Sequence, residues 1–113
     1  KFGNLQISRE WNWCKDQCFY LLKFIKKKPQ DFILSNGKSY SAIQMLKFAF
    51  NYLKLDYRLF ILQDKKFFRK KDINSIRSKY KICLKRNKIK RQDKIYGEVM
   101  IKKMINHFKK DNI

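Results

Sequence analysis

Residues 31–53, DFILSNGKSYSAIQMLKFAFNYL, carry the clearest structural signals in the chain. The compact apolar run at 31–35 is closed by an Asn-Gly pair, which predicts a short strand that runs into a turn. Ser41 and Gln44 then form a capping box, because the hydroxyl and the amide can each satisfy a free backbone donor at a helix start. The predicted helix has one apolar face, made of Ala42, Leu46, Ala49, Phe50 and Leu53.

On the N-terminal side of this stretch, the pattern predicts a short extended segment at residues 3–7 and then a helix. Asn12 is the candidate N-cap of that helix, and the lysine run before Pro29 ends it. Its apolar positions follow helical spacing, which makes the helix amphipathic. These positions are Cys14, Cys18, Leu21, Leu22 and Ile25.

On the C-terminal side, residues 57–62 are rich in aromatic and β-branched side chains, which favours a strand. Residues 75–85 predict a short helix, and a last helix follows. The inner face of that last helix is expected to hold Ile101, Met104, Ile105 and Phe108. Alternating strands and helices predict an α/β unit with about four helices, a single domain over residues 1–113, whose strands need partners from elsewhere.

The composition describes a small, folding and strongly basic chain. It has 113 residues, of which 44% are hydrophobic, and 29 Lys and Arg stand against 9 acidic residues, for a net charge of +20. Such a field attracts anions, phosphates among them. Two alternatives stay open: the lysines are spread over solvated faces, or basic and aromatic residues such as those at 67–71 bind nucleic acid. Only charge supports the second, since no known nucleic-acid-binding motif is present.

The three cysteines, Cys14, Cys18 and Cys83, are an odd number without CxxC spacing, which favours a reducing, cytoplasmic setting. His107 is the only histidine, so we expect no zinc site. No apolar run approaches the roughly 20 residues needed to cross a bilayer. Because the chain opens at Lys1 without an initiator Met, we expect that an N-terminal part is missing.

Three ordered blocks with matching intervals resemble the GDP-mannose 4,6-dehydratases. The first is Gly3-Asn4-Leu5 with Arg9-Glu10-Trp11 and Lys15-Asp16; the second is residues 28–37 followed by Tyr40-Ser41; the third is residues 55–57 followed by 64–69. The likeness covers about residues 3–110, although beyond Asp72 it depends on helical pattern more than on identities. The chain departs from the family at Asn12, Cys14, Gln17 and Lys70, which suggests that packing is kept better than binding chemistry.

The resemblance implies the C-terminal, substrate-binding part of an extended short-chain dehydrogenase/reductase, without the Rossmann cofactor domain. The intact family enzyme is a lyase of nucleotide-sugar metabolism that uses NADP to convert GDP-mannose to GDP-4-dehydro-6-deoxy-mannose. Here the three glycines are too far apart to form a dinucleotide turn, and none of the six tyrosines has a lysine four positions later. We therefore expect no catalytic residue, no bound cofactor and no activity from this chain alone. A separately encoded N-terminal half would restore a split enzyme. The resemblance also allows a homo-oligomer for the intact enzyme.

The residues that the resemblance implies for this chain are therefore those that bind the nucleotide-sugar substrate. Arg9 and Arg69 match family arginines that lie against the diphosphate of the sugar nucleotide, and the planar guanidinium suits phosphate oxygens. The alternative for each is an ion pair with a nearby acid, such as Glu10 or Asp72. Asn4 is a weaker candidate near the base pocket. We also expect Trp11 to be a core residue rather than a ligand-stacking one, and Asp16, which matches a family acidic residue, to be structural.

Overall fold

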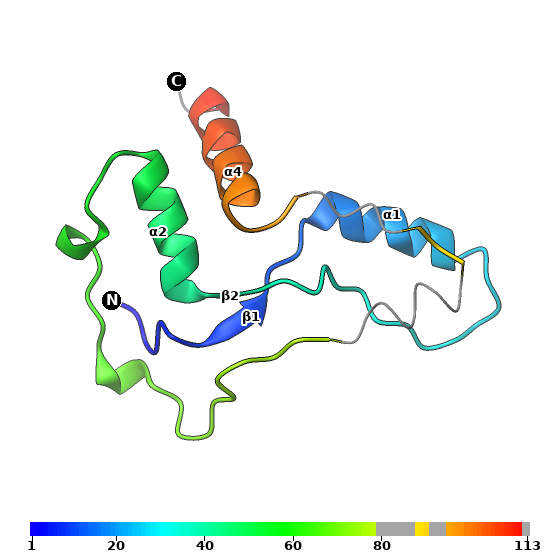
Figure 1. Ribbon diagram of the computed structural model, residues 1–113, viewed down its shortest axis with the longest axis horizontal. Coiled ribbons are helices and arrows are strands. Elements are labelled where there is room, and N and C mark those ends of the chain that lie inside the picture. Colours follow the sequence, from blue (N-terminus) through cyan, green and yellow to red (C-terminus); the bar gives the residue numbers. More distant parts are fainter. Residues whose placement is uncertain (79–87, 91–94, 112–113) are drawn as a thin grey trace.

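The computed structural model describes residues 1–78, 88–90 and 95–111. In that part of the chain, three α-helices accompany a sheet of two strands, so the architecture is a small mixed α/β one (Figure 1). In chain order the elements are β1 (Ser8–Glu10), α1 (Cys14–Phe24), β2 (Ser39–Ser41), α2 (Ala42–Tyr52), the short 3₁₀ helices η1 (Tyr57–Leu59) and η2 (Lys65–Phe67), and α4 (Gly97–Asp111).

The two strands form the centre of the molecule. β1 and β2 are antiparallel, with Ser8 opposite Ser41, Arg9 opposite Tyr40 and Glu10 opposite Ser39. Just beyond the ladder, the indole nitrogen of Trp11 donates to the carbonyl of Tyr40 at 3.0 Å. Figure 1 shows α1 on one side of this ladder and α2 and α4 on the other.

Residues 31–35, predicted as a strand, are not in a sheet. Side-chain hydrogen bonds hold this region in place of a ladder. Asn36 is almost fully buried; its backbone N–H donates to Asn12 Oδ1 at 3.0 Å, and its Nδ2 donates to the carbonyl of Trp11 at 2.6 Å. Asn12 therefore does not cap α1 as predicted; the N-cap position is Trp13, which has no side-chain cap bond.

The first helix is where predicted, but its buried face is not. Tyr20 and Phe24, one turn apart, are the buried residues of α1, and the ring of Phe24 stacks on that of Phe32 with centroids 4.2 Å apart. The predicted face is exposed instead, with Leu22 at 66% and Ile25 at 79%. Two apolar stripes compete on this helix, and the aromatic one buries more area per side chain.

The prediction of a strand at residues 57–62 is wrong. Asp56 Oδ1 accepts from the backbone N–H of Arg58 at 3.0 Å and begins η1, and the carbonyl of Tyr57 accepts from Phe60 and Ile61. An aspartate before a turn offers the backbone this local alternative to a ladder. Residues rich in β-propensity then form a turn, because these local bonds take the place of strand pairing.

The predicted extended segment at residues 3–7 has also moved. Asn4 Oδ1 accepts from the N–H of Gln6 at 3.0 Å and makes a turn, so the strand begins at Ser8. Before the turn, Phe2 pairs with Gln63 in a parallel bridge. Gly3 lies against the end of η2, so close that an added Cβ would be 2.5 Å from the carbonyl oxygen of Phe67.

The prediction of the second helix is confirmed, including both bonds of its capping box: Ser41 Oγ accepts from Gln44 N, and Gln44 Oε1 accepts from Ser41 N. The last helix is confirmed as α4, which packs against α2. Met100 is its buried hydrophobic side chain, whereas two residues of its predicted inner face, Met104 and Phe108, are 52% and 68% exposed.

Of the helix predicted at residues 75–85, the part from 79 onward lies outside the described residues. Ser75 is not helical, because it forms a parallel bridge with Ser8. None of the described helices is both long and apolar enough to cross a membrane.

The described chain is open and flat. Its radius of gyration is 16.9 Å, whereas a compact domain of this length has about 13 Å. The principal extents are 50 × 41 × 17 Å, so most elements are covered on one side only. Large side chains such as Leu59 (80% exposed) and Leu62 (64%) consequently face outward.

Candidate functional site

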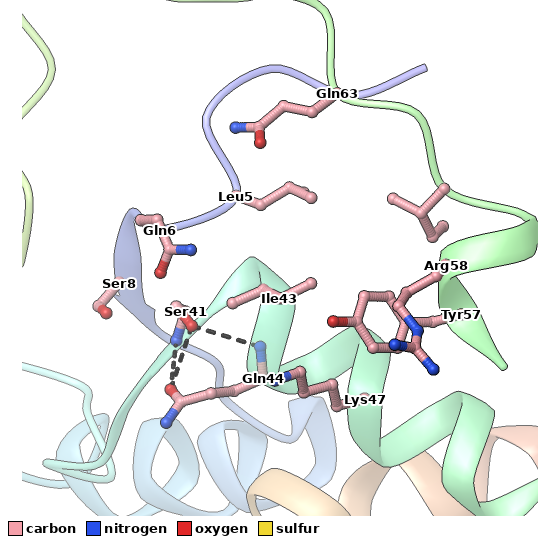
Figure 2. A pocket seen from close by; sticks show the side chains of 11 residues that line it. Leu5, Gln6, Ser8, Ser41, Ile43, Gln44, Lys47, Tyr57, Arg58 and Gln63 are labelled. Carbon is pink, nitrogen blue, oxygen red and sulfur yellow. Dashed lines mark hydrogen bonds between the residues drawn. The ribbon is translucent and has the colours of Figure 1, made fainter.

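A polar cavity of about 690 Å³ lies between the N-terminal segment, the start of α2 and η1 (Figure 2). Its lining comes from three parts of the chain: Leu5, Gln6 and Ser8; Ser41, Ile43, Gln44 and Lys47; Tyr57, Arg58, Ile61 and Gln63. Figure 2 shows Leu5 and Ile43 between the amide of Gln63 on one side and Gln44 and Lys47 on the other. The cavity therefore has an apolar middle with polar groups around it.

Strand geometry decides which side chains reach this cavity. Successive side chains of a strand point to opposite faces. Ser8 and Ser41, which are paired across the ladder, both line the cavity. Their neighbours Arg9 and Tyr40 form the next pair and do not line it. The capping box holds the Ser41 end of this wall rigidly, because it ties β2 to the first turn of α2.

Two cations line the cavity. The Nζ of Lys47 lies 5.6 Å from the centre of the Tyr57 ring, a favourable cation–π contact. Arg58 pairs with Asp56: Nε donates to Oδ1 at 3.0 Å, and Nη2 donates to Oδ2 at 2.9 Å. This pair lowers the pKa of Asp56 and raises that of Arg58. The pairing therefore persists at neutral pH and is lost only as the pH falls through the lowered pKa of Asp56.

Arg9, predicted to clamp a diphosphate, instead forms hydrogen bonds within its own chain. Its Nη2 donates to Asp72 Oδ1 at 2.7 Å, and its Nη1 donates to the carbonyls of Ser8 and Ile73, each at 2.8 Å. Three of the five guanidinium N–H groups are thereby used, which leaves two for another acceptor. The pair with Asp72 is the alternative that the sequence had suggested.

Arg69 and Asn4 lie near the same region. Arg69 follows η2, is exposed, and has no ion-pair partner within the described ranges. It is three residues from Asp72, so the Cα atoms of these two residues are within about 11 Å. Asn4 is half-buried, and its side chain closes the turn to Gln6. Neither Arg69 nor Asn4 lines the cavity.

Lys47 and Arg58 were not singled out from the sequence. In a chain with 29 basic residues, a single lysine or arginine has no distinguishing spacing. One signal was present: Asp56 precedes Arg58 by two residues, which suits a capped turn that returns a side chain to the aspartate. Recognising the turn at 57–59 would have put Tyr57 and Arg58 beside α2.

The described residues do not fit NADP. A dinucleotide site needs closely spaced glycines between a strand and a helix. Gly37 and Gly97 have positive φ, at 66° and 54°, but they lie far apart in the sequence. Gly97 does begin α4, yet the group it approaches is Tyr40, whose ring would be 2.7 Å from an added Cβ. Close approach at this glycine serves helix packing.

No protein-family model matches the chain. Two curated proteins of Arabidopsis thaliana do. GDP-mannose 4,6 dehydratase 1 is 26% identical over 76 residues, and GDP-mannose 4,6 dehydratase 2 is 27% identical over 75. This chain is similar to the GDP-mannose 4,6-dehydratases.

Each match covers 66% of this chain but only 21% and 20% of the respective relative. The chain thus spans about a fifth of the length of the curated relatives it matches. The matches support the likeness to this family, and they give no support to the nucleic-acid-binding alternative.

Proposed function

We propose that this chain is the sugar-nucleotide-binding portion of a GDP-mannose 4,6-dehydratase-like enzyme, and that the cavity beside β1 and α2 holds the nucleotide sugar. The observation that carries the proposal is the meeting of three family-like segments at this cavity. Leu5 of the first, Ser41 of the second and Tyr57 of the third all line it. Gly3 and Phe67, in contact, hold the first and third together.

The cavity suits this class of ligand. Its volume of about 690 Å³ lies within the range typical of small-molecule sites. A diphosphate needs fixed cations, which Lys47 and Arg58 provide. The Tyr57 ring offers a flat face to a base, and the amides of Gln6 and Gln63 offer donors and acceptors to sugar hydroxyls.

Arg9 and Arg69 form a second candidate phosphate site, with Asn4 as a weaker substrate-binding candidate near the base pocket. Arg9 keeps two unused N–H groups, and Arg69 is exposed near its partner Asp72. This site would lie on the other face of β1 from Ser8, outside the cavity. The two candidate sites predict different mutational results.

Binding of GDP-mannose to the purified chain, measured by calorimetry, tests the cavity. Lys47→Ala and Arg58→Ala are each expected to weaken binding roughly tenfold or more, because each removes a charged hydrogen bond to the diphosphate. Asp56→Asn is expected to tighten binding several-fold, because it releases Arg58 while its amide oxygen still caps η1.

Arg69→Ala, an exposed substitution, is the matched control and is expected to leave the affinity unchanged. The reverse pattern, with binding lost in Arg69→Ala and kept in Lys47→Ala, would move the ligand to the second candidate site. Absence of selective GDP-mannose binding would defeat the proposal, and tight, steeply salt-dependent binding to any RNA would favour the nucleic-acid alternative.

A GDP-mannose dehydratase reaction would require a partner unit that supplies NADP and the catalytic residues, whether that unit belongs to the same polypeptide or to another one. The groove between α2 and α4 is the surface we propose for that partner. It has a volume of about 1060 Å³, an apolar floor that includes Leu53, Ile101 and Met104, and lysines around it. Those lysines are Lys103, Lys109 and Lys110. The +20 charge of the chain selects a partner whose apolar contact surface is flanked by acidic residues.

To test this docking surface, the chain is co-expressed with the part of Arabidopsis GDP-mannose 4,6 dehydratase 1 that lies outside the matched segment. The wild-type chain is expected to co-purify with it, and Met104→Lys is expected to abolish co-purification by placing a charge in the apolar floor. Val99→Lys, on an exposed position of α4 outside the groove, is the control that keeps binding. If Val99→Lys abolishes binding and Met104→Lys does not, the groove is not the docking surface.

A further inference from the structure

Two cysteines lie together on the exposed side of α1, away from the cavity. Cys14 is the first residue of the helix and Cys18 is one turn later, so their side chains share a face. The two Sγ atoms are 3.9 Å apart, and both thiols are free and exposed. The pair is therefore reachable from solvent and already has its sulfur atoms side by side.

The separation of the sulfurs matches a single bridging metal ion. A metal–thiolate bond is about 2.3 Å long, so two sulfurs on one ion are at most about 4.6 Å apart. The 3.9 Å observed falls within this limit. We propose that Cys14 and Cys18 form a two-sulfur binding site for a soft, thiophilic cation, with Cu(I) as the ion that fits it best.

The ligand set selects among metals. Thiolates prefer soft ions such as Cu(I), which two sulfurs can satisfy. A structural zinc ion needs four ligands, and the described residues contain no group of three or more His, Cys, Asp or Glu side chains that could hold a metal. Zn²⁺ would have to complete its shell with water, so it should bind more weakly.

The surroundings favour the complex that would form. Cu(I) with two thiolates carries one net negative charge. This charge would sit at the N-terminal end of α1, where the helix dipole favours anions, in a chain of net charge +20.

Anaerobic titration of the full chain with Cu(I) against a coloured chelator tests the site. One ion per chain is expected, with an affinity for Cu(I) well above that for Zn²⁺ in a parallel titration. Cys14→Ser and Cys18→Ser are each expected to weaken Cu(I) binding at least about 100-fold, since loss of a ligand should exceed the 10- to 100-fold effect of outer-shell changes. Both positions are exposed, and unchanged circular dichroism would show that the fold is kept.

Cys83→Ser is the matched control and is expected to leave the affinity unchanged. An equal loss in Cys83→Ser would overturn the two-sulfur site, as would unaltered Cu(I) binding in Cys14→Ser. The site is independent of the nucleotide-sugar proposal, because neither cysteine lines the cavity, so either proposal can fail without the other.

Discussion

Replacing Glu10 with alanine is expected to lower the free energy of unfolding by about 3 kcal/mol. The carboxylate accepts from the backbone N–H of Ser78 at 2.7 Å, from the Ser78 hydroxyl and from the Ser35 hydroxyl. Ser35 is buried, so its hydroxyl would lose its acceptor in a place that water does not reach. One side chain thereby joins β1 to two segments far away in the sequence.

Chemical denaturation monitored by circular dichroism measures this loss. Glu10→Gln keeps one acceptor oxygen and the volume, so it should lose about half as much as the alanine variant. Glu98→Gln is the matched control, since Glu98 pairs with Lys102 on the exposed side of α4 and such pairs contribute less than about 1 kcal/mol. If Glu10→Ala lowers the free energy of unfolding no more than Glu98→Gln does, the bonds from Glu10 to Ser35 and Ser78 do not stabilise the fold.

Gly3→Ala is expected to destabilise the chain by about 2–3 kcal/mol. The new methyl group would meet the Phe67 carbonyl oxygen at 2.5 Å and its carbon at 3.1 Å, and these are backbone atoms that cannot rotate away. Relief requires the N-terminal segment to move. That movement would lengthen two backbone hydrogen bonds, each 2.8 Å long. In one the N–H of Phe2 donates to the carbonyl of Leu62, and in the other the N–H of Asp64 donates to the carbonyl of Phe2.

The same substitution should weaken nucleotide-sugar binding, because Leu5 and Gln63 line the cavity on either side of this contact. Asn4→Ala is the control: it removes one exposed hydrogen bond to Gln6 and should cost less than about 1.5 kcal/mol. The measurements are denaturant midpoints and calorimetric affinities for both variants. A Gly3→Ala chain as stable as wild type would mean that the N-terminal segment does not pack against Phe67.

Elements whose signals are local were predictable. The capping box at Ser41 and Gln44 needs only four residues, and both of its hydrogen bonds form as predicted. The last helix was found from apolar spacing alone, and α1 was found in the right place. What local spacing did not decide was which face of a helix is buried. In α1 two stripes were available, and Tyr20 and Phe24 are buried because Phe32 and Leu34 return to cover them.

Strands were predicted poorly because a strand needs a partner. Residues 31–35 and 57–62 have strand-like composition, but in this fold Asn36, which follows the first, bonds to Trp11 and Asn12, and Asp56, which precedes the second, begins a turn. The strand that does form, β1, comes from the polar run at Ser8–Glu10. It forms because Ser39–Ser41 and Ser75 approach it from distant parts of the chain.

The residues of the candidate sites were likewise found in part from the sequence and in part only from the structure. Arg9 and Arg69 were selected by their positions in two family-like blocks; the structure pairs Arg9 with Asp72, whereas Arg69 is near Asp72 only by its position in the sequence. Lys47 and Arg58 are eleven residues apart in a chain with 29 basic residues, and only the turn at η1 brings them to one cavity. By itself, the sequence determined the capped helix α2, the basic charge and the likeness to GDP-mannose 4,6-dehydratases, since each depends on residue type and short spacing. Tertiary structure alone decided the strand pairing, the buried faces and the cavity, because these depend on which distant segments meet.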